Sequence, residues 1–196
     1  MPHVHADFHE QGINEPFYFA PAAEPYHEVI TKWQRDFQHM IGKNNAIYFD
    51  KNGWLYFTKE FFDLLYPSYG DTYPTYLGAI GMTYEQAGGG VAGLGILNSE
   101  GKNLTLVDRV RHNTVAGIST IEISSANSKK LNEEFNKFFI NNNNVNYIIN
   151  GDSDKINQLS EFLRKHKIDF YSPKVQKLSA FSYNKKKFLG YITKTG

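Results

Sequence analysis

The sequence has 196 residues, with 21 Lys and Arg against 20 Asp and Glu, and it contains no Cys. This length fits one medium-sized domain, or one domain with part of another, and 41% hydrophobic residues at a net charge of +1 exclude a disordered chain. The missing Cys excludes a disulfide scaffold, a Cys-based zinc finger and a thiol nucleophile. No apolar run approaches the roughly 20 residues of a membrane span, and the start of the chain, Met-Pro-His-Val-His, lacks the layout of a signal peptide.

Charge is distributed unevenly along the chain. Residues 1–128 contain 8 basic and 14 acidic side chains, whereas residues 129–196 contain 13 basic and 6 acidic ones. This asymmetry predicts a domain boundary near residue 128. The lysines after that point alternate with apolar residues, as on a solvated helix face, and no RNA-binding motif appears, so we expect no nucleic-acid partner.

In the first half of the chain, alternation predicts a strand over residues 3–9, with His3, His5, Asp7 and His9 on one face. The Pro-rich residues 12–25 are expected to form a loop. Apolar residues at helical spacing predict an amphipathic helix from about residue 26 to residue 41, with Gly42 as its stop.

In the second half, residues 66–76 have too many Tyr, Pro and Gly for regular structure, and residues 77–86 are expected to form a buried strand that ends at Glu85. Helices are expected over 104–126 and about 128–140. A strand at 145–149, a helix opened by Asp152 or Ser153 and a strand at 168–171 would form a β-α-β unit.

His9 and Glu85 form the strongest candidate site. Each residue is expected at the carboxyl end of a buried strand, and ligands of open α/β sheets bind at that edge. A neutral imidazole can ligate zinc, and a partly desolvated glutamate can take a proton from metal-bound water.

Two weaker patterns point elsewhere. Glycines 88, 90 and 93 have the G-x-G-x-x-G spacing of a dinucleotide site, but no helix is expected directly after them, which favours a flexible loop. His3-x-His5 has the spacing of the paired metal ligands of an amidohydrolase barrel, although 196 residues are too few for an eightfold strand–helix repeat.

Two segments carry a family resemblance: Asp7-Phe-His-Glu-Gln-Gly-Ile-Asn-Glu-Pro-Phe-Tyr-Phe-Ala-Pro-Ala-Ala-Glu-Pro25, and the segment from Tyr66-Pro-Ser-Tyr-Gly-Asp through Met-Thr-Tyr-Glu-Gln-Ala-Gly88. They resemble the zinc carboxypeptidase (carboxypeptidase A-like) family, and most nearly a bacterial branch with large, multi-domain members. The resemblance implies the carboxyl-terminal half of a mixed-sheet, three-layer α/β peptidase domain over residues 1–128. An incomplete second α/β domain would then occupy residues 129–196.

The same resemblance implies roles for individual residues. His9 matches the third zinc ligand of the family, Glu85 its catalytic glutamate, and Tyr69, with Tyr66 and Tyr73 as alternatives, the mobile tyrosine that closes over a peptide substrate. The family's His-x-x-Glu ligand pair does not occur in this sequence, and no Arg precedes His9. The remaining ligands of a Zn2+ site are therefore expected upstream, and the resemblance also implies an exported, extracytoplasmic location.

Three interpretations stay open. The chain is a truncated zinc metallocarboxypeptidase, a non-catalytic relative that binds peptides or cell-wall fragments, or a small α/β enzyme of another class that uses His9 and Glu85 with His5 or Asp7. The sequence decides neither substrate specificity nor oligomeric state.

Overall fold

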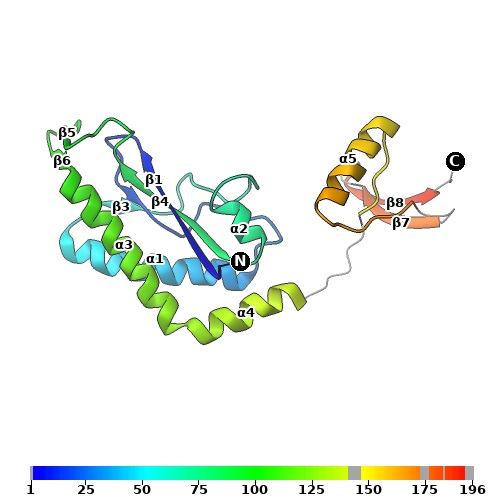
Figure 1. The fold of residues 1–196 in the computed structure, drawn as a ribbon, viewed down its shortest axis with the longest axis horizontal. Coiled ribbons are helices and arrows are strands. Elements are labelled where there is room, and N and C mark those ends of the chain that lie inside the picture. The colour runs from blue at the N-terminus through cyan, green and yellow to red at the C-terminus, as the bar shows by residue number, and fades with distance from the viewer. Residues whose placement is uncertain (1, 141–146, 173–176, 183, 193–196) are drawn as a thin grey trace. The chain divides into compact units, whose positions relative to one another are not determined.

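The computed structural model describes residues 2–140, 147–172, 177–182 and 184–192. The chain divides into two compact units, residues 1–142 and residues 143–196. Figure 1 shows the elements of both units along the chain.

A mixed four-stranded sheet forms the centre of the first unit. Its strands lie in the order β1 (Val4–Gln11), β4 (Ile80–Ala87), β2 (Phe17–Tyr18) and β3 (Tyr56–Phe57). β1 and β4 are parallel, β2 pairs antiparallel with β4, and β2 and β3 are parallel. The protein is therefore of mixed α/β class, and the strands predicted at 3–9 and 77–86 are confirmed, each shifted by a few residues.

Side chains of the two long strands alternate between the faces of this sheet. Ile80, Met82 and Tyr84 of β4 belong to the main hydrophobic core, against which Val4 and Ala6 of β1 pack. The intervening residues of each strand point to the opposite face, because successive side chains of a strand point to opposite sides. This alternation separates an apolar face from the polar face that carries His9 and Glu85.

Helix α1 (Lys32–Asn52) packs on the apolar face and supplies Phe37, Ile41 and Phe49 to the core. The helix begins after Thr31, whose side chain and that of Gln34 form a reciprocal capping box, and it ends at Gly53 in the left-handed conformation. The predicted bounds of 26–41 were wrong. Gly42 lies in the interior of α1. An added Cβ there would lie less than 3.0 Å from the backbone oxygen of Ala20.

Two buried glutamines tie α1 to its surroundings. The Gln34 amide donates to the carbonyl oxygens of Thr75 and Ala79, both at 2.8 Å. The Gln38 amide donates to the carbonyl of Gly81 at 2.7 Å and accepts from the backbone N–H of Ala22 at 3.1 Å. These bonds satisfy backbone groups that would otherwise be buried without partners.

The Pro-rich segment expected to be a loop lies largely inside the protein. Residues 17–23 are buried, and within them β2 pairs with both β3 and β4. Residues 66–76, expected to be irregular, contain the short helix α2 (Thr72–Tyr76). The prolines limit β2 to two residues, but they do not keep the segment out of the core, because its aromatic side chains fill the space between α1 and the sheet.

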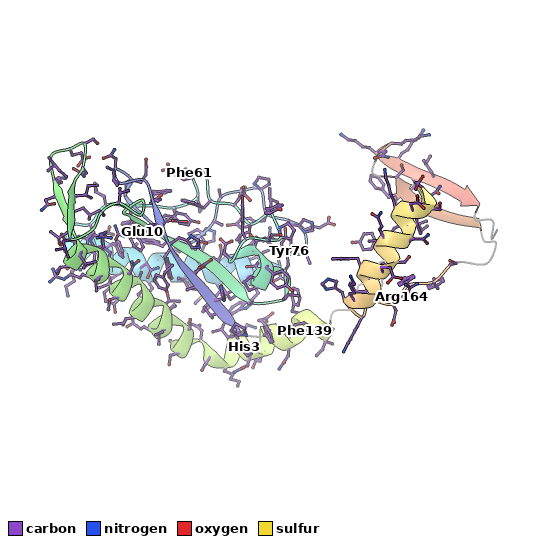
Figure 2. The ribbon with its side chains drawn as sticks, turned by 45° about the horizontal axis from the view of Figure 1, so that its top comes forward. His3, Glu10, Phe61, Tyr76, Phe139 and Arg164 are labelled. Atoms are coloured by element: carbon purple, nitrogen blue, oxygen red, sulfur yellow. The ribbon has the colours of Figure 1, made fainter. Side chains whose placement is uncertain are left out.

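Helices α3 (Leu106–Ala126) and α4 (Ser128–Ile140) confirm the two helices predicted in this region. α4 belongs to the first unit: Leu131 is buried in the main core, and the ring of Phe135 lies 4.3 Å from that of His3. In Figure 2, Phe139 of α4 and His3 lie near the start of β1, with Glu10 near its far end. The units therefore divide after residue 142 and not after residue 128, because the apolar side of α4 covers the start of the sheet.

The second unit contains helix α5 (Ser153–Lys165), β7 (Lys177–Ser182) and β8 (Lys187–Ile192), and the two strands form an antiparallel pair. Asp152 caps α5 as predicted, accepting from the N–H of Asp154 at 2.9 Å. The predicted β-α-β unit is wrong in its described part, since residues 147–150 and 168–171 are not in strands. Short apolar runs do not by themselves distinguish a strand from an irregular segment. In the described parts of both units, no helix has the length and apolarity to cross a membrane.

Small strands β5 (Gly95–Leu97) and β6 (Asn103–Thr105) form a hairpin between β4 and α3. The glycine run therefore leads into this hairpin and not into a helix. Gly89, Gly90 and Gly93 have positive φ, as in a tight loop. The G-x-G-x-x-G spacing accordingly belongs to a loop, which is the element expected there.

Candidate functional site

His9 and Glu85 lie side by side on the polar face of the sheet. In the parallel pairing of β1 with β4, His9 is the register partner of Glu85. Tyr18 of β2 is the antiparallel partner of Glu85 on its other side. Both residues stand two positions before the carboxyl ends of their strands, which is the edge where α/β sheets form sites.

A cavity of about 400 Å³ opens over these two residues. The strands supply its floor, and the segment between β3 and α2 supplies its wall. The lining residues are Asp7, His9, Phe61, Phe62, Asp63, Tyr69, Gly70, Asp71, Thr83 and Glu85. The cavity therefore combines carboxylates, one imidazole and three aromatic rings.

Glu85 is 7% exposed and lies at the bottom of this arrangement. Burial raises the pKa of its carboxyl, the neighbouring His9 lowers it, and the carboxylates of Asp7 and Asp71 raise it further. The oxygens of this carboxylate are not among the fully buried side-chain atoms of the described residues that have no hydrogen-bond partner. A carboxyl group in these surroundings holds its proton to a higher pH than a solvated one, as a proton-transferring group does.

The His9 ring is more accessible, with 56% of its side chain exposed. Its Nε2 lies 3.1 Å from Oδ2 of Asp7, two residues earlier on the same face of β1. When Nε2–H donates to that carboxylate, Nδ1 is left as the free ligand atom. A carboxylate that orients a histidine in this way is common beside metal-ligating imidazoles.

Of the three candidate tyrosines, the structure brings Tyr69 to the cavity. The residue is 56% exposed, and its ring lies 5.1 Å from that of Tyr66. Tyr66 and Tyr73 are also exposed but do not line the cavity. A half-exposed tyrosine at the rim has room to move, and its catalytic role stays a prediction.

Two acidic residues of the cavity were not singled out by the sequence. Asp71 is 7% exposed and accepts from the hydroxyl groups of Thr72 at 3.2 Å and Thr83 at 2.9 Å. Asp63 accepts from the backbone N–H of Leu65 at 2.8 Å. Both lie in segments without a periodic pattern, so only the tertiary fold brings them beside Glu85.

An ion pair holds the glycine loop, residues 88–93, in place next to the site. The Arg109 side chain, 10% exposed, donates to Glu10 at 3.0 Å and also to the carbonyl of Gly93. The other Glu10 oxygen accepts from the N–H of Gly90 at 2.8 Å. An added Cβ on Gly88 would lie 2.6 Å from this carboxylate, so the glycine makes room for it. The glycine loop is thus fixed to the end of β1.

The remaining histidines of interest lie outside the cavity. The Nδ1–H of His112 donates to Oε1 of Gln86 at 2.8 Å, and burial lowers the pKa of the imidazole. His3 packs on Phe135. Across the part of the chain that the structure describes, no group of three or more His, Asp or Glu side chains is placed to hold a metal ion. His3 and His5 therefore do not form a metal pair with a third ligand there.

Comparison with known proteins does not assign the chain to a family. No family model, no curated protein and no solved structure matches it.

Proposed function

We propose that residues 1–142 contribute one side of the active site of a zinc-dependent metallocarboxypeptidase, with His9 as a metal ligand, Glu85 as the proton-transferring residue and Tyr69 as a hydrogen-bond donor to the substrate. The observation that carries the proposal is the pairing of His9 with Glu85 across two parallel strands at the floor of one cavity. The family resemblance of the two segments around these residues supports it. The fold that goes with the proposal is the carboxyl-terminal part of a three-layer carboxypeptidase sandwich.

The donor atoms of this chain fit zinc in part. His9 presents an accessible imidazole that a neighbouring carboxylate orients, which suits one ligand position. A catalytic zinc site uses three protein ligands, and the described residues contain no group of three. The proposal therefore places the other ligands, a His-x-x-Glu pair in the resembled family, outside the printed sequence. When bound, zinc would activate a water molecule for attack on the peptide carbonyl.

Glu85 supplies the proton transfer. Its raised pKa, caused mainly by burial, brings the carboxyl closer to neutral pH than a solvated glutamate. At neutral pH it would take a proton from the attacking water and pass it to the leaving amine. Tyr69 lines the same cavity and would donate from its hydroxyl group to the substrate as the reaction proceeds.

The test uses the full-length product of the gene, purified with its metal, and peptides with a free carboxyl terminus. We expect release of the terminal residue, a loss of nearly all turnover in Glu85→Gln with the zinc content retained, and a loss of zinc in His9→Ala. Glu60→Gln and His166→Ala are matched controls outside the cavity, and both should leave turnover and zinc content unchanged. If Glu85→Gln kept full turnover, Glu85 would not be the proton-transferring residue.

The same preparation distinguishes the alternative function. A protein that binds peptides or cell-wall fragments without releasing any product, with or without zinc, would be the non-catalytic relative. In that case Glu85→Gln would change binding alone.

A further inference from the structure

β1 is the outermost strand of the four-stranded sheet, and no strand of the described residues pairs with its outer edge. Odd-numbered residues of β1 turn their backbone groups toward β4, as the bond from the N–H of Ile80 to the carbonyl of His3 at 2.9 Å shows. The groups of the even-numbered residues therefore point outward. Native proteins usually protect a long edge strand with Lys, Pro or a bulge, because an open edge pairs with other chains. β1 has eight residues and contains neither Lys nor Pro.

Helix α3 stands over this edge on the apolar face of the sheet. An added Cβ on Gly117 would lie 3.5 Å from the ring of Phe8, so this side of α3 is the side next to β1. The opposite side meets α1, where the amide of Asn44 donates to Ser119 and Glu122. The side of α3 that faces away from α1 therefore continues the open edge of β1.

This outer side of α3 carries an exposed stripe of uncharged residues at helical spacing: Val110, Thr114, Ile118 and Ile121. Val110 is 55% exposed and Ile121 is 69% exposed. Surface helices normally turn such an apolar stripe toward another element. In an antiparallel pair of these helices, Val110 of each copy would meet Ile121 of the other.

The position of α3 sets the distance between two such helices. α3 contacts both β1 and β4, so its axis lies above the gap between these strands, about half a strand spacing inside β1. A two-fold axis between paired β1 strands would lie half a spacing outside β1. Since paired strands are about 4.8 Å apart, the two α3 axes would be about 10 Å apart, which is the distance between packed helices. Strand pairing and helix packing therefore fit the same two-fold axis.

The polar face of β1 is complementary to itself in one antiparallel register. A two-fold axis through Ala6, perpendicular to the sheet, places Asp7 opposite the second copy's His5, and does so twice. These are pairs without backbone hydrogen bonds between them, in which side chains approach most closely. The outer pair, His3 with the second copy's His9, joins two imidazoles, of which one can donate to the other. Acidic and basic groups therefore face each other across the axis.

The apolar face favours the same register. The axis through Ala6 places Val4 opposite the second copy's Phe8, and Phe8 is 46% exposed in the single chain. An axis through Asp7 would put the two Asp7 carboxylates opposite each other, and an axis through Phe8 would put Ala6 opposite the second copy's Glu10. An axis nearer the start of β1 shortens the pairing, and an axis between two residues would bring side chains of opposite faces together.

We propose that β1 and α3 form an interface between two copies of this chain, in which two β1 strands pair antiparallel about an axis at Ala6 and the two α3 stripes pack on each other. The complementary charges and apolar residues of β1 identify the occupant of the edge as a second copy. The inference goes beyond the proposed function and does not rest on it, because it involves neither a metal nor a substrate.

The oligomeric state is measured on the 196-residue chain and on the full-length gene product, by light scattering after size exclusion and by sedimentation equilibrium. At about 10 µM and above we expect dimers of both, with twice the 22.5 kDa mass of the chain for the shorter protein. A monomer, or an open-ended series of oligomers, would overturn the proposal. A dimer of the shorter chain beside a monomeric full-length product would assign the edge to another part of the polypeptide and would overturn it as well.

One pair of substitutions tests the helix stripe. Ile121→Lys should raise the dissociation constant of the dimer at least about thirtyfold, because each copy would bury an unpaired ammonium group. Ile47→Lys is the matched control, since Ile47 is an isoleucine of α1 with a similar exposure of 64%. This control should leave the constant unchanged, and circular dichroism checks that both variants are folded. Equal effects of the two variants, or no effect of either, would overturn the interface.

Cross-linking tests the strand register, because the chain has no Cys of its own. His5→Cys and Asp7→Cys proteins are mixed in equal amounts and oxidised, and mass spectrometry identifies the disulfides. The proposed register brings positions 5 and 7 of different copies within disulfide distance, so the mixed 5–7 bond should exceed each of the 5–5 and 7–7 bonds at least about tenfold. Predominance of the 5–5 or the 7–7 bond, or a yield no higher than that of Ile47→Cys, would overturn the proposed pairing. Hydrolysis of peptides by the full-length product is scored separately, so failure of the peptidase function leaves these results unaffected.

Discussion

Replacing Gly42 by alanine tests the packing of α1 against the buried segment 17–23. An added Cβ would lie less than 3.0 Å from the backbone oxygen of Ala20 and 2.9 Å from Cδ of Pro21. The backbone of Ala20 cannot move aside as a flexible side chain can. We therefore expect the added methyl group to cost about 3 kcal/mol of strain, the upper end for overpacked sites. Alanine also recovers about 1 kcal/mol of helix propensity. The net expected loss is therefore about 2 kcal/mol.

Gly117→Ala is the matched control, because Gly117 also lies inside a long helix but its added Cβ would meet only Phe8 at an ordinary 3.5 Å. We expect this variant to gain about 0.5–1 kcal/mol. Urea denaturation followed by circular dichroism gives both free energies of unfolding. Thermal unfolding should show Tm lowered by about 4–8 °C for Gly42→Ala and raised by a few degrees for Gly117→Ala.

The two substitutions should change the free energy of unfolding in opposite directions, and this difference decides the test. If Gly42→Ala were as stable as the wild type, the close approach of α1 to Ala20 would be wrong, and Gly42 would have the free surroundings of a helix end. If both variants lost stability equally, helix propensity and local packing would not account for either change.

Three further predictions concern charge and capping. Because the pKa of Glu85 is raised in the folded protein, the folded state binds its proton more tightly than the unfolded state does, so the stability that comes from this group is full at acidic pH and is lost as the pH rises through the folded pKa. Glu85→Gln should therefore unfold at higher urea than the wild type at neutral pH and at nearly equal urea near pH 4, and a constant difference would contradict the raised pKa. Glu10→Gln should lose about 1–3 kcal/mol of stability and speed proteolysis in the glycine loop, because it leaves the largely buried Arg109 without a counter-charge; an unchanged cleavage rate, with Glu15→Gln as control, would contradict the clamp. Thr31→Ala should cost about 1 kcal/mol in urea denaturation by removing the capping box of α1, while Thr31→Ser should retain most of it, and equal stabilities of all three proteins would show that the cap is not formed.

The bounds of α1 show where sequence patterns were insufficient. Apolar residues from Tyr26 onward continued the helical spacing, and Gly42 had the identity of a helix stop. The capping box of Thr31 and Gln34 and the left-handed Gly53 set the real ends. Gly42 is glycine because another part of the chain approaches it, and a local pattern carries no information about such an approach.

The candidate site was foreseen in part. His9 and Glu85 could be paired because each ends a strand with a clear pattern, and the structure puts them in register. Tyr69 reaches the cavity, whereas Tyr66 and Tyr73 do not. Asp63 and Asp71 were missed, since they lie in irregular segments. Asp7 was noticed as a neighbour of His9 on one strand face and as a possible partner of His9 and Glu85, but its approach to Gly70 joins segments more than sixty residues apart and was not foreseen.

The sequence by itself determined the mixed α/β class, the two long strands, the last three helices and the strand face on which His9 stands, because these depend on hydrophobic period and on local capping. The tertiary structure decided that the Pro-rich segment is core, that α4 belongs to the first unit, and that four carboxylates surround one cavity. Those features arise from contacts between distant segments, and their residues show no periodic pattern along the chain. The acidic cavity therefore becomes visible only when the strands and the loop before α2 are brought together.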